Sequence, residues 1–228
     1  LSGASISWTL VSLSPGLSIA FRVDAMGMLF ALVSSFLWII TTIYSIGYMR
    51  GLKEHSQTRY FCFFSLSLSA AVGVAFSANL LTMYLFYEML SFATYPLVTH
   101  HQDREARSSG RKYIGYILGS SIALALPAMI IVYSLTGTLT FAGTGIMADA
   151  GLSTTAMAIL LLMFVFGFAK AGVMPVHSWL PAAMVAPTPV SALLHAVAVV
   201  KVGVFCVVRV ITGVFGVGVL SAMHLGTV

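Results

Sequence analysis

The chain has 228 residues, of which 59% are hydrophobic and 7% charged, with a mean hydropathy of +1.01 and a net charge of +5. So few polar groups could not cover the surface of a soluble domain of this length, which excludes a soluble fold and indicates a polytopic membrane protein. The basic excess lies in loops, so we expect membrane lipid as a partner and no nucleic acid. The two cysteines, Cys62 and Cys206, lie in apolar runs and are expected to be buried packing residues, neither disulfide-bonded nor metal-bound.

The first segment, residues 1–23, alternates weakly between polar and apolar residues and contains Ser-Pro-Gly as a turn. We expect it to form an extracytoplasmic hairpin and not a membrane span. No basic region precedes it, so no signal peptide is expected.

Six apolar stretches follow, each long enough to cross about 30 Å of hydrocarbon at about 1.5 Å per residue of helix. They predict an all-α, polytopic transmembrane helical bundle over 24–212, and we expect 213–228 to be the start of a truncated seventh helix. The six predicted spans are 24–49, 60–77, 79–99, 112–135, 154–181 and 188–212.

The charges of the loops alternate along the chain. Loop 50–59 has three basic residues and one acid, and loop 100–112 has four basic residues and two acids, whereas loop 136–153 carries only Asp149. Because basic loops stay on the cytoplasmic side, we expect both basic loops in the cytoplasm of a protein of the cell inner membrane. Arg209 would then lie near the outer face, where its long stem could reach water.

Three ionisable residues lie in the middle of apolar stretches, namely Glu88, Lys170 and Lys201. A charge at the centre of a bilayer costs about 2.5–3.5 kcal/mol, so such residues are kept mainly where a pathway needs them. Glu88 could be a neutral glutamate held by a hydrogen bond, or it could pair with a buried cation and help to move protons. The two lysines could likewise be inert, but mid-membrane lysines favour proton transfer.

Lys170 is followed by Ala-Gly-Val-Met and Pro175. Proline removes a backbone hydrogen bond and clashes with the preceding turn, so we expect a broken helix between Lys170 and Pro181, with Pro175 as the cause. Broken helices expose carbonyl groups at mid-membrane, which transporters use to hold water or ions.

Two histidines, His177 and His195, extend this set of titratable groups and suit a proton relay, although each alone could be a hydrogen-bonding packing residue. His55, His100 and His101 fall in the basic loops, where we expect solvated side chains. No metal site, cofactor or catalytic site is expected in the chain.

The segment AKAGVMPVHSWLPAAMVAPTPVSALLHAVAVVKVGVF resembles a signature of the antiporter-like subunits shared by respiratory complex I, Mrp-type cation/proton antiporters and membrane-bound hydrogenases. FRVDAMGMLFALVSS, YSIGYM and NLLTMYLFYEML fit the same family, so the resemblance spans roughly 20–210. Lys201 followed by Val-Gly-Val-Phe is most similar to the D-type Mrp subunit.

The resemblance implies that Glu88 is the key glutamate, Lys170 the lysine on the broken helix, Lys201 the central lysine of the next helix and His195 the histidine of the signature. It also implies one five-helix inverted-repeat unit over 60–212, with the second repeat of such subunits missing. The expected function is translocation of protons, or exchange of a cation such as Na⁺ for protons, within a respiratory or Mrp-type complex whose other membrane subunits are partners. That complex could be of the NADH:quinone oxidoreductase type. The alternative is a truncated or split subunit that serves only as a scaffold.

Overall fold

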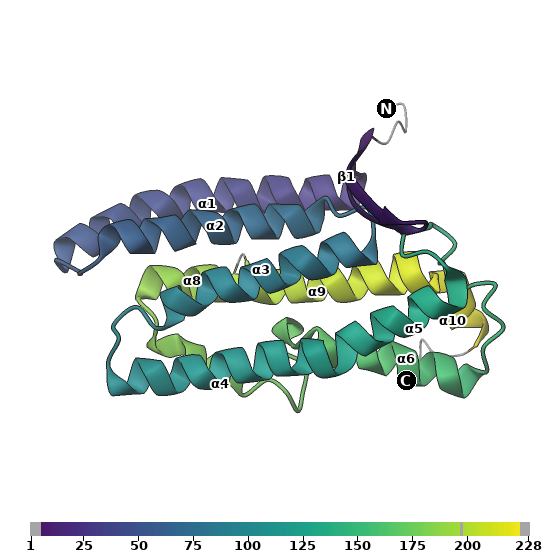
Figure 1. The fold of residues 1–228 in the computed structure, drawn as a ribbon. Coiled ribbons are helices and arrows are strands. Elements are labelled where there is room, and N and C mark those ends of the chain that lie inside the picture. Colours follow the sequence, from purple (N-terminus) through teal and green to yellow (C-terminus); the bar gives the residue numbers. More distant parts are fainter. Residues whose placement is uncertain (1–5, 197, 224–228) are drawn as a thin grey trace.

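The computed structural model describes residues 6–196 and 198–223, whose helices run side by side along one axis with a β-hairpin at one end (Figure 1). The α-helices are α1 (Ala25–Gly51), α2 (Gln57–Ala75), α3 (Leu80–Val98), α4 (Arg104–Ser120), α5 (Leu126–Thr136), α6 (Thr154–Gly167), α7 (Trp179–Ala182), α8 (Thr188–Ala196), α9 (Val199–Val210) and α10 (Val217–Ala222). Shorter helical turns are η1 (Ser121–Ala125) and η4 (Ile211–Phe215), which are π-helical, and η2 (Ala169–Ala171) and η3 (Ala183–Val185), which are 3-10 helices.

The hairpin consists of β1 (Ile6–Ser14) and β2 (Leu17–Val23), which pair antiparallel. All of β1 is exposed, whereas β2 contacts the junction between α2 and α3. There the backbone amide of Ala20 donates to the hydroxyl of Thr82 at 3.0 Å. These contacts fix the hairpin to the bundle.

Polar side chains set the first residue of several helices. Asp24, Asn79, Asp103 and Ser153 each precede a helix and accept a hydrogen bond from the backbone amide three residues later, at 2.8, 2.8, 2.6 and 3.3 Å. These bonds satisfy amide groups that the first helical turn leaves unpaired. Local sequence therefore determines where α1, α3, α4 and α6 begin.

Three helices in the described part of the chain are long and apolar enough to cross a membrane: α1, α2 and the continuous helix Arg104–Thr136 formed by α4, η1 and α5. The predicted span 188–212 is divided into α8 and α9, a division that the sequence does not indicate. The predicted span 154–181 contains an α-helix only as far as Gly167 before α7 begins.

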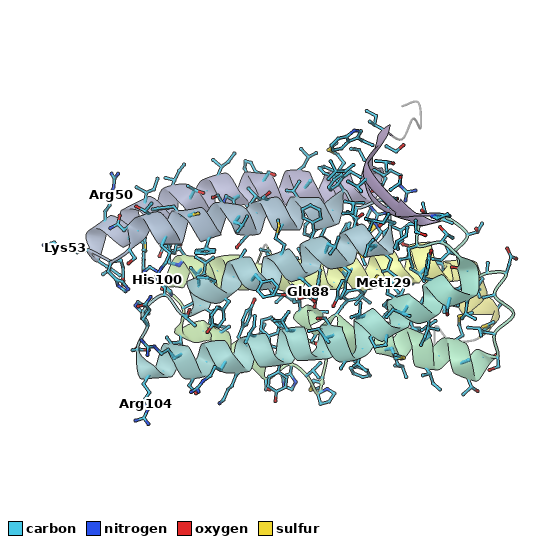
Figure 2. All side chains as sticks on the ribbon, viewed as in Figure 1. Arg50, Lys53, Glu88, His100, Arg104 and Met129 are labelled. Carbon is cyan, nitrogen blue, oxygen red and sulfur yellow. The ribbon has the colours of Figure 1, made fainter. Side chains whose placement is uncertain are left out.

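Both basic loops lie at the same end of the bundle. Arg50, Lys53, His100 and Arg104 gather there, while Glu88 lies about halfway along the helices (Figure 2). The β-hairpin lies at the opposite end (Figure 1). The fold therefore places Glu88 between a basic end and the hairpin end.

One prediction about the cysteines was wrong. Cys206 is fully buried on α9, but Cys62 is exposed on α2. An apolar run around a residue does not say which face of the helix it occupies, and Cys62 lies on a face of α2 that the described residues leave uncovered.

Candidate functional site

Glu88 lies on α3 and is partly buried, and two serine hydroxyls hold its carboxylate. Ser121, in the π-helical turn η1, donates to Oε1, and Ser91 donates to Oε2 at 3.2 Å. None of the ion pairs closer than 4.0 Å among the described residues includes Glu88. The carboxylate is therefore held by hydroxyl groups rather than by direct contact with a cation.

Lys170 lies in η2 and is fully buried. Its Nζ donates to the backbone carbonyl of Tyr87 and lies 3.5 Å from the centroid of the Tyr87 ring. The Lys170 backbone amide also donates to the hydroxyl of Tyr87, at 3.3 Å. The lysine thus contacts the residue immediately before Glu88, so the two ionisable groups are neighbours without being paired.

The chain around Lys170 is not α-helical. The helix α6 ends at Gly167, Phe168 leaves the helical region with φ −86° and ψ 54°, and Gly172 takes a left-handed conformation with φ +74°. Trp179 Nε1 donates to the carbonyl of Ala169 at 3.1 Å and so satisfies a group that the broken helix frees. Because α6 ends before Lys170, Pro175 is not the residue at which this helix stops.

Gly203 on α9 allows the Lys170 segment to come close. A Cβ atom at this position would overlap the backbone of Ala171 and of Lys170. A residue without a side chain is therefore needed for η2 to pack against α9, as the structure has it.

Lys201 and His177, which were also singled out from the sequence, are not among the hydrogen-bond or ion-pair partners of Glu88 and Lys170 in the described part of the chain. Lys201 is exposed on α9, beside an open apolar groove of about 410 Å³ lined by residues of α1 and α9. His177 is exposed in the turn before Trp179. The backbone of His195 belongs to α8, but its side chain lies outside the described part of the structure.

Sequence reasoning missed two contacts of the site. Ser121 lies 33 residues from Glu88, and Lys170 lies 83 residues from Tyr87, so only the tertiary fold brings them together. Ser91 could have been found, since a residue three positions after Glu88 on a helix lies on the same face.

An ion pair between a buried arginine and a partly buried aspartate lies at the hairpin end. Arg209 is 6% exposed, and its Nη1 and Nη2 bind the two carboxylate oxygens of Asp24 at 2.5 and 2.8 Å. The expectation that Arg209 extends to water was therefore wrong, because Asp24 offers it a partner. The backbone amide of Gly27 also donates to this carboxylate at 2.8 Å, and Arg22 Nη2 lies 3.9 Å from it.

Arg209→Ala is expected to lower the free energy of unfolding by about 1–3 kcal/mol, because the Asp24 carboxylate, 24% exposed, loses its charge-assisted hydrogen bonds from Arg209. Thermal unfolding in detergent measures the effect, with the exposed Arg104→Ala as the control. An unfolding midpoint equal to that of the parent protein at neutral pH would contradict this role.

Comparison with known proteins places these residues in a family. The family model described as "NADH:quinone oxidoreductase/Mrp antiporter, TM" matches residues 77–224, and "NADH-Ubiquinone oxidoreductase (complex I), chain 5 N-terminus" matches residues 8–61. The A subunit of a Na(+)/H(+) antiporter from Alkalihalophilus pseudofirmus is 33% identical over 205 residues, and an A1 subunit from Staphylococcus aureus is 31% identical over 202 residues. These relatives are of the A type, so the resemblance to a D-type subunit is not confirmed.

The matches cover 89% and 85% of this chain but only 25% and 24% of those two relatives, so the chain spans about a quarter of their length. Among solved structures, the Mrp complex from Dietzia sp. aligns with a TM-score of 0.82 at 20% identity, covering 96% of this chain and 24% of that one. An archaeal respiratory membrane complex, the membrane-bound sulfane sulfur reductase, aligns with a TM-score of 0.73 at 20% identity, covering 92% and 33%. The chain belongs to the NADH:quinone oxidoreductase/Mrp antiporter family of transmembrane proteins.

Proposed function

We propose that this chain translocates protons, or exchanges a cation such as Na⁺ for protons, as part of a membrane complex with other membrane subunits. The names of its relatives, which are Na(+)/H(+) antiporter subunits, support this function. The observation that carries it is Lys170, a fully buried lysine on a broken helix beside the helix that bears Glu88. A buried cation is expensive, and a structural helix break does not need one.

The proposed step is a change in the distance between Lys170 and Glu88. Two unit charges at 4 Å attract by about 4 kcal/mol at an effective dielectric constant of 20. The serine hydroxyls stabilise the ionised carboxylate of Glu88. When the Lys170 ammonium approaches this carboxylate, Lys170 binds its proton more tightly, and when the ammonium withdraws, Lys170 binds the proton less tightly. The Tyr87 carbonyl is a neutral resting contact for the ammonium when it is withdrawn.

From Lys170 the proton would pass through water and His195 toward Lys201, as the family resemblance implies. Lys201 lies on α9, the helix that packs against η2, so the two lysines belong to contacting elements. His177 lies in the turn that follows η2 and would serve exchange with the aqueous side. Each proton moved through the full potential is worth about 2.3 kcal/mol per 100 mV, which the complex must supply or can use.

The orientation follows from charge. We place the basic end, with loops 50–59 and 100–112, in the cytoplasm and the hairpin of residues 1–23 on the outer side of the cell inner membrane. Residues 24–212 would form the translocating domain, and 60–212 its five-helix repeat. Pro175 would keep the chain from returning to a helix directly after the break, since proline cannot continue the hydrogen-bonding pattern.

Glu88→Gln tests the function. Glutamine keeps the size but not the charge, and its amide nitrogen donates to one of the two serine hydroxyls where the carboxylate oxygen accepted, so proton translocation in membrane vesicles should fall by on the order of a hundredfold while the protein still assembles. Proton uptake is followed with a fluorescent pH probe, and assembly by co-purification of the membrane subunits. The matched control is Glu105→Gln, an exposed glutamate at the start of α4. Uptake equal to the parent protein in Glu88→Gln would refute the proposal and favour a scaffolding role.

A further inference from the structure

Four side chains that the proposed function does not use meet at the basic end of the bundle. Glu54 and His55 come from the loop between α1 and α2, and His100 and His101 come from the loop between α3 and α4. Figure 2 shows His100 at the same end of the bundle as Arg50, Lys53 and Arg104. We call these four residues the loop cluster.

One carboxylate oxygen lies at the centre of the loop cluster. Glu54 Oε2 is 3.8 Å from His55 Nδ1, 3.9 Å from His100 Nε2 and 3.8 Å from His101 Nδ1. The ligand atoms of Glu54, His55 and His100 all lie within 4.8 Å of one another. Three nitrogen atoms thus surround one oxygen atom at distances too long for hydrogen bonds.

His100 is the residue that indicates a bound ligand. Its side chain is fully buried, and neither Nδ1 nor Nε2 has a hydrogen-bond partner among the described residues. Buried polar atoms are nearly always bonded, so two free ring nitrogens in one side chain call for an explanation. The expectation of a solvated loop histidine was wrong, because the rings of His55 and Tyr60 cover it at centroid distances of 4.8 and 5.6 Å.

His55 is held in the orientation that metal-binding histidines usually have. Its Nε2 is 3.1 Å from the backbone carbonyl of His100, a contact in which that nitrogen donates. The proton is then on Nε2, which leaves the lone pair of Nδ1 facing Glu54. A ligating histidine commonly donates its other N–H to a carbonyl group, which fixes its tautomer.

We propose that Glu54, His55 and His100 bind a Zn²⁺ ion, with His101 Nδ1 available for the fourth position. Zinc ligands at about 2.0–2.1 Å in a tetrahedron lie about 3.3 Å from one another, so the three ligand atoms, which lie within 4.8 Å of one another, would move together by up to about 1.5 Å around the ion. Imidazole nitrogen and carboxylate oxygen are both ordinary zinc ligands. The ion would join the two loops at the basic end and so fix the end of α3, the helix that carries Glu88.

The test is Zn²⁺ binding to the purified protein in detergent, measured by isothermal titration calorimetry after treatment with a chelator. We expect one Zn²⁺ per chain, with affinity at least about tenfold lower in Glu54→Gln and in His55→Ala, since loss of one ligand or its support typically costs this much or more. Co²⁺ in place of Zn²⁺ should give the intense visible absorption of tetrahedral coordination. The proposal would be overturned if the parent protein bound no Zn²⁺, or if both variants bound Zn²⁺ with the same affinity as the parent protein.

His177→Ala is the matched control, because it removes an exposed histidine outside the loop cluster and should leave the affinity unchanged. His55 is half exposed, so its replacement should not prevent folding, and circular dichroism checks this. As a second measurement, Zn²⁺ should raise the thermal unfolding midpoint of the parent protein and of His177→Ala but not of the two ligand variants. An equal rise in all four proteins would place the zinc elsewhere and refute the site.

Discussion

Replacing Lys170 by methionine is expected to remove proton translocation while leaving the protein at least as stable as the parent. Methionine has similar length and fits a buried site, but it has no proton to exchange and no ammonium group. Replacing a buried charge by an apolar side chain is often neutral or stabilising, so the free energy of unfolding should stay level or rise. The translocation rate should fall by on the order of a hundredfold, as for loss of a residue that transfers protons.

Vesicle proton uptake and thermal unfolding are measured on the same Lys170→Met preparation. Lys112→Met is the matched control, because Lys112 is exposed on α4 and its loss should affect neither quantity. Normal uptake in Lys170→Met would show that protons follow another path. A large loss of stability would show instead that the contact with Tyr87 is needed to hold the broken helix.

Gly203→Ala is expected to have the second largest effect on stability and on the translocation rate, since it changes the position of Lys170 but not its charge. The new methyl group would overlap the backbone of Ala171 and Lys170, and backbone atoms cannot move aside as a flexible side chain can. Overpacking of this kind costs about 1–3 kcal/mol. Displacement of η2 should also lower the translocation rate.

Gly119→Ala is the control for the backbone effect of an added methyl group. Gly119 lies on α4, and a Cβ atom there would have no described neighbour within 4 Å, so alanine should be neutral or should stabilise the helix by up to about 1 kcal/mol. Unfolding midpoints and uptake rates are compared between the two variants. Equal behaviour of Gly203→Ala and Gly119→Ala would contradict the close packing of η2 on α9.

The ionisable residues of the site could be singled out from the sequence, but the groups that hold them could not. Glu88 and Lys170 are recognisable because a charge in an apolar stretch is costly whatever the fold. The hydroxyl of Ser121 and the carbonyl of Tyr87 carry no such signal, because serines and backbone carbonyls occur in every helix. Their role depends on which helices become neighbours.

The end of α6 shows a second limit of what can be predicted from the sequence. The sequence offers Pro175 as a helix breaker, yet the helix already ends at Gly167. At Gly167 a Cβ atom would clash with Ala125 in η1, so α6 and η1 are in close contact at the residue where α6 ends. Proline chemistry predicts that a chain cannot remain helical beyond a point, but it does not predict at which earlier residue the helix ends.

The loop cluster shows the same limit for the histidines. His55 and His100 are 45 residues apart, in two loops that each look solvated in the sequence. Metal-ligand spacing within one short segment is absent, so the sequence predicted no metal site. Only the arrangement of α1, α2 and α3 brings the two loops to one place.

The π-helical turn η1 has a consequence for how one long helix can serve two sets of neighbours. A π turn accommodates an extra residue, so the side-chain phase shifts by about 100° between the residues before Ser121 and those after Ala125. The first half, α4, consequently meets α3 and α7, while η1 and α5 meet α6. Ser121 is the first residue of η1, where the neighbours of the long helix change from α3 and α7 to α6. A single span thus presents a hydroxyl to Glu88 and, beyond it, a surface that packs against α6.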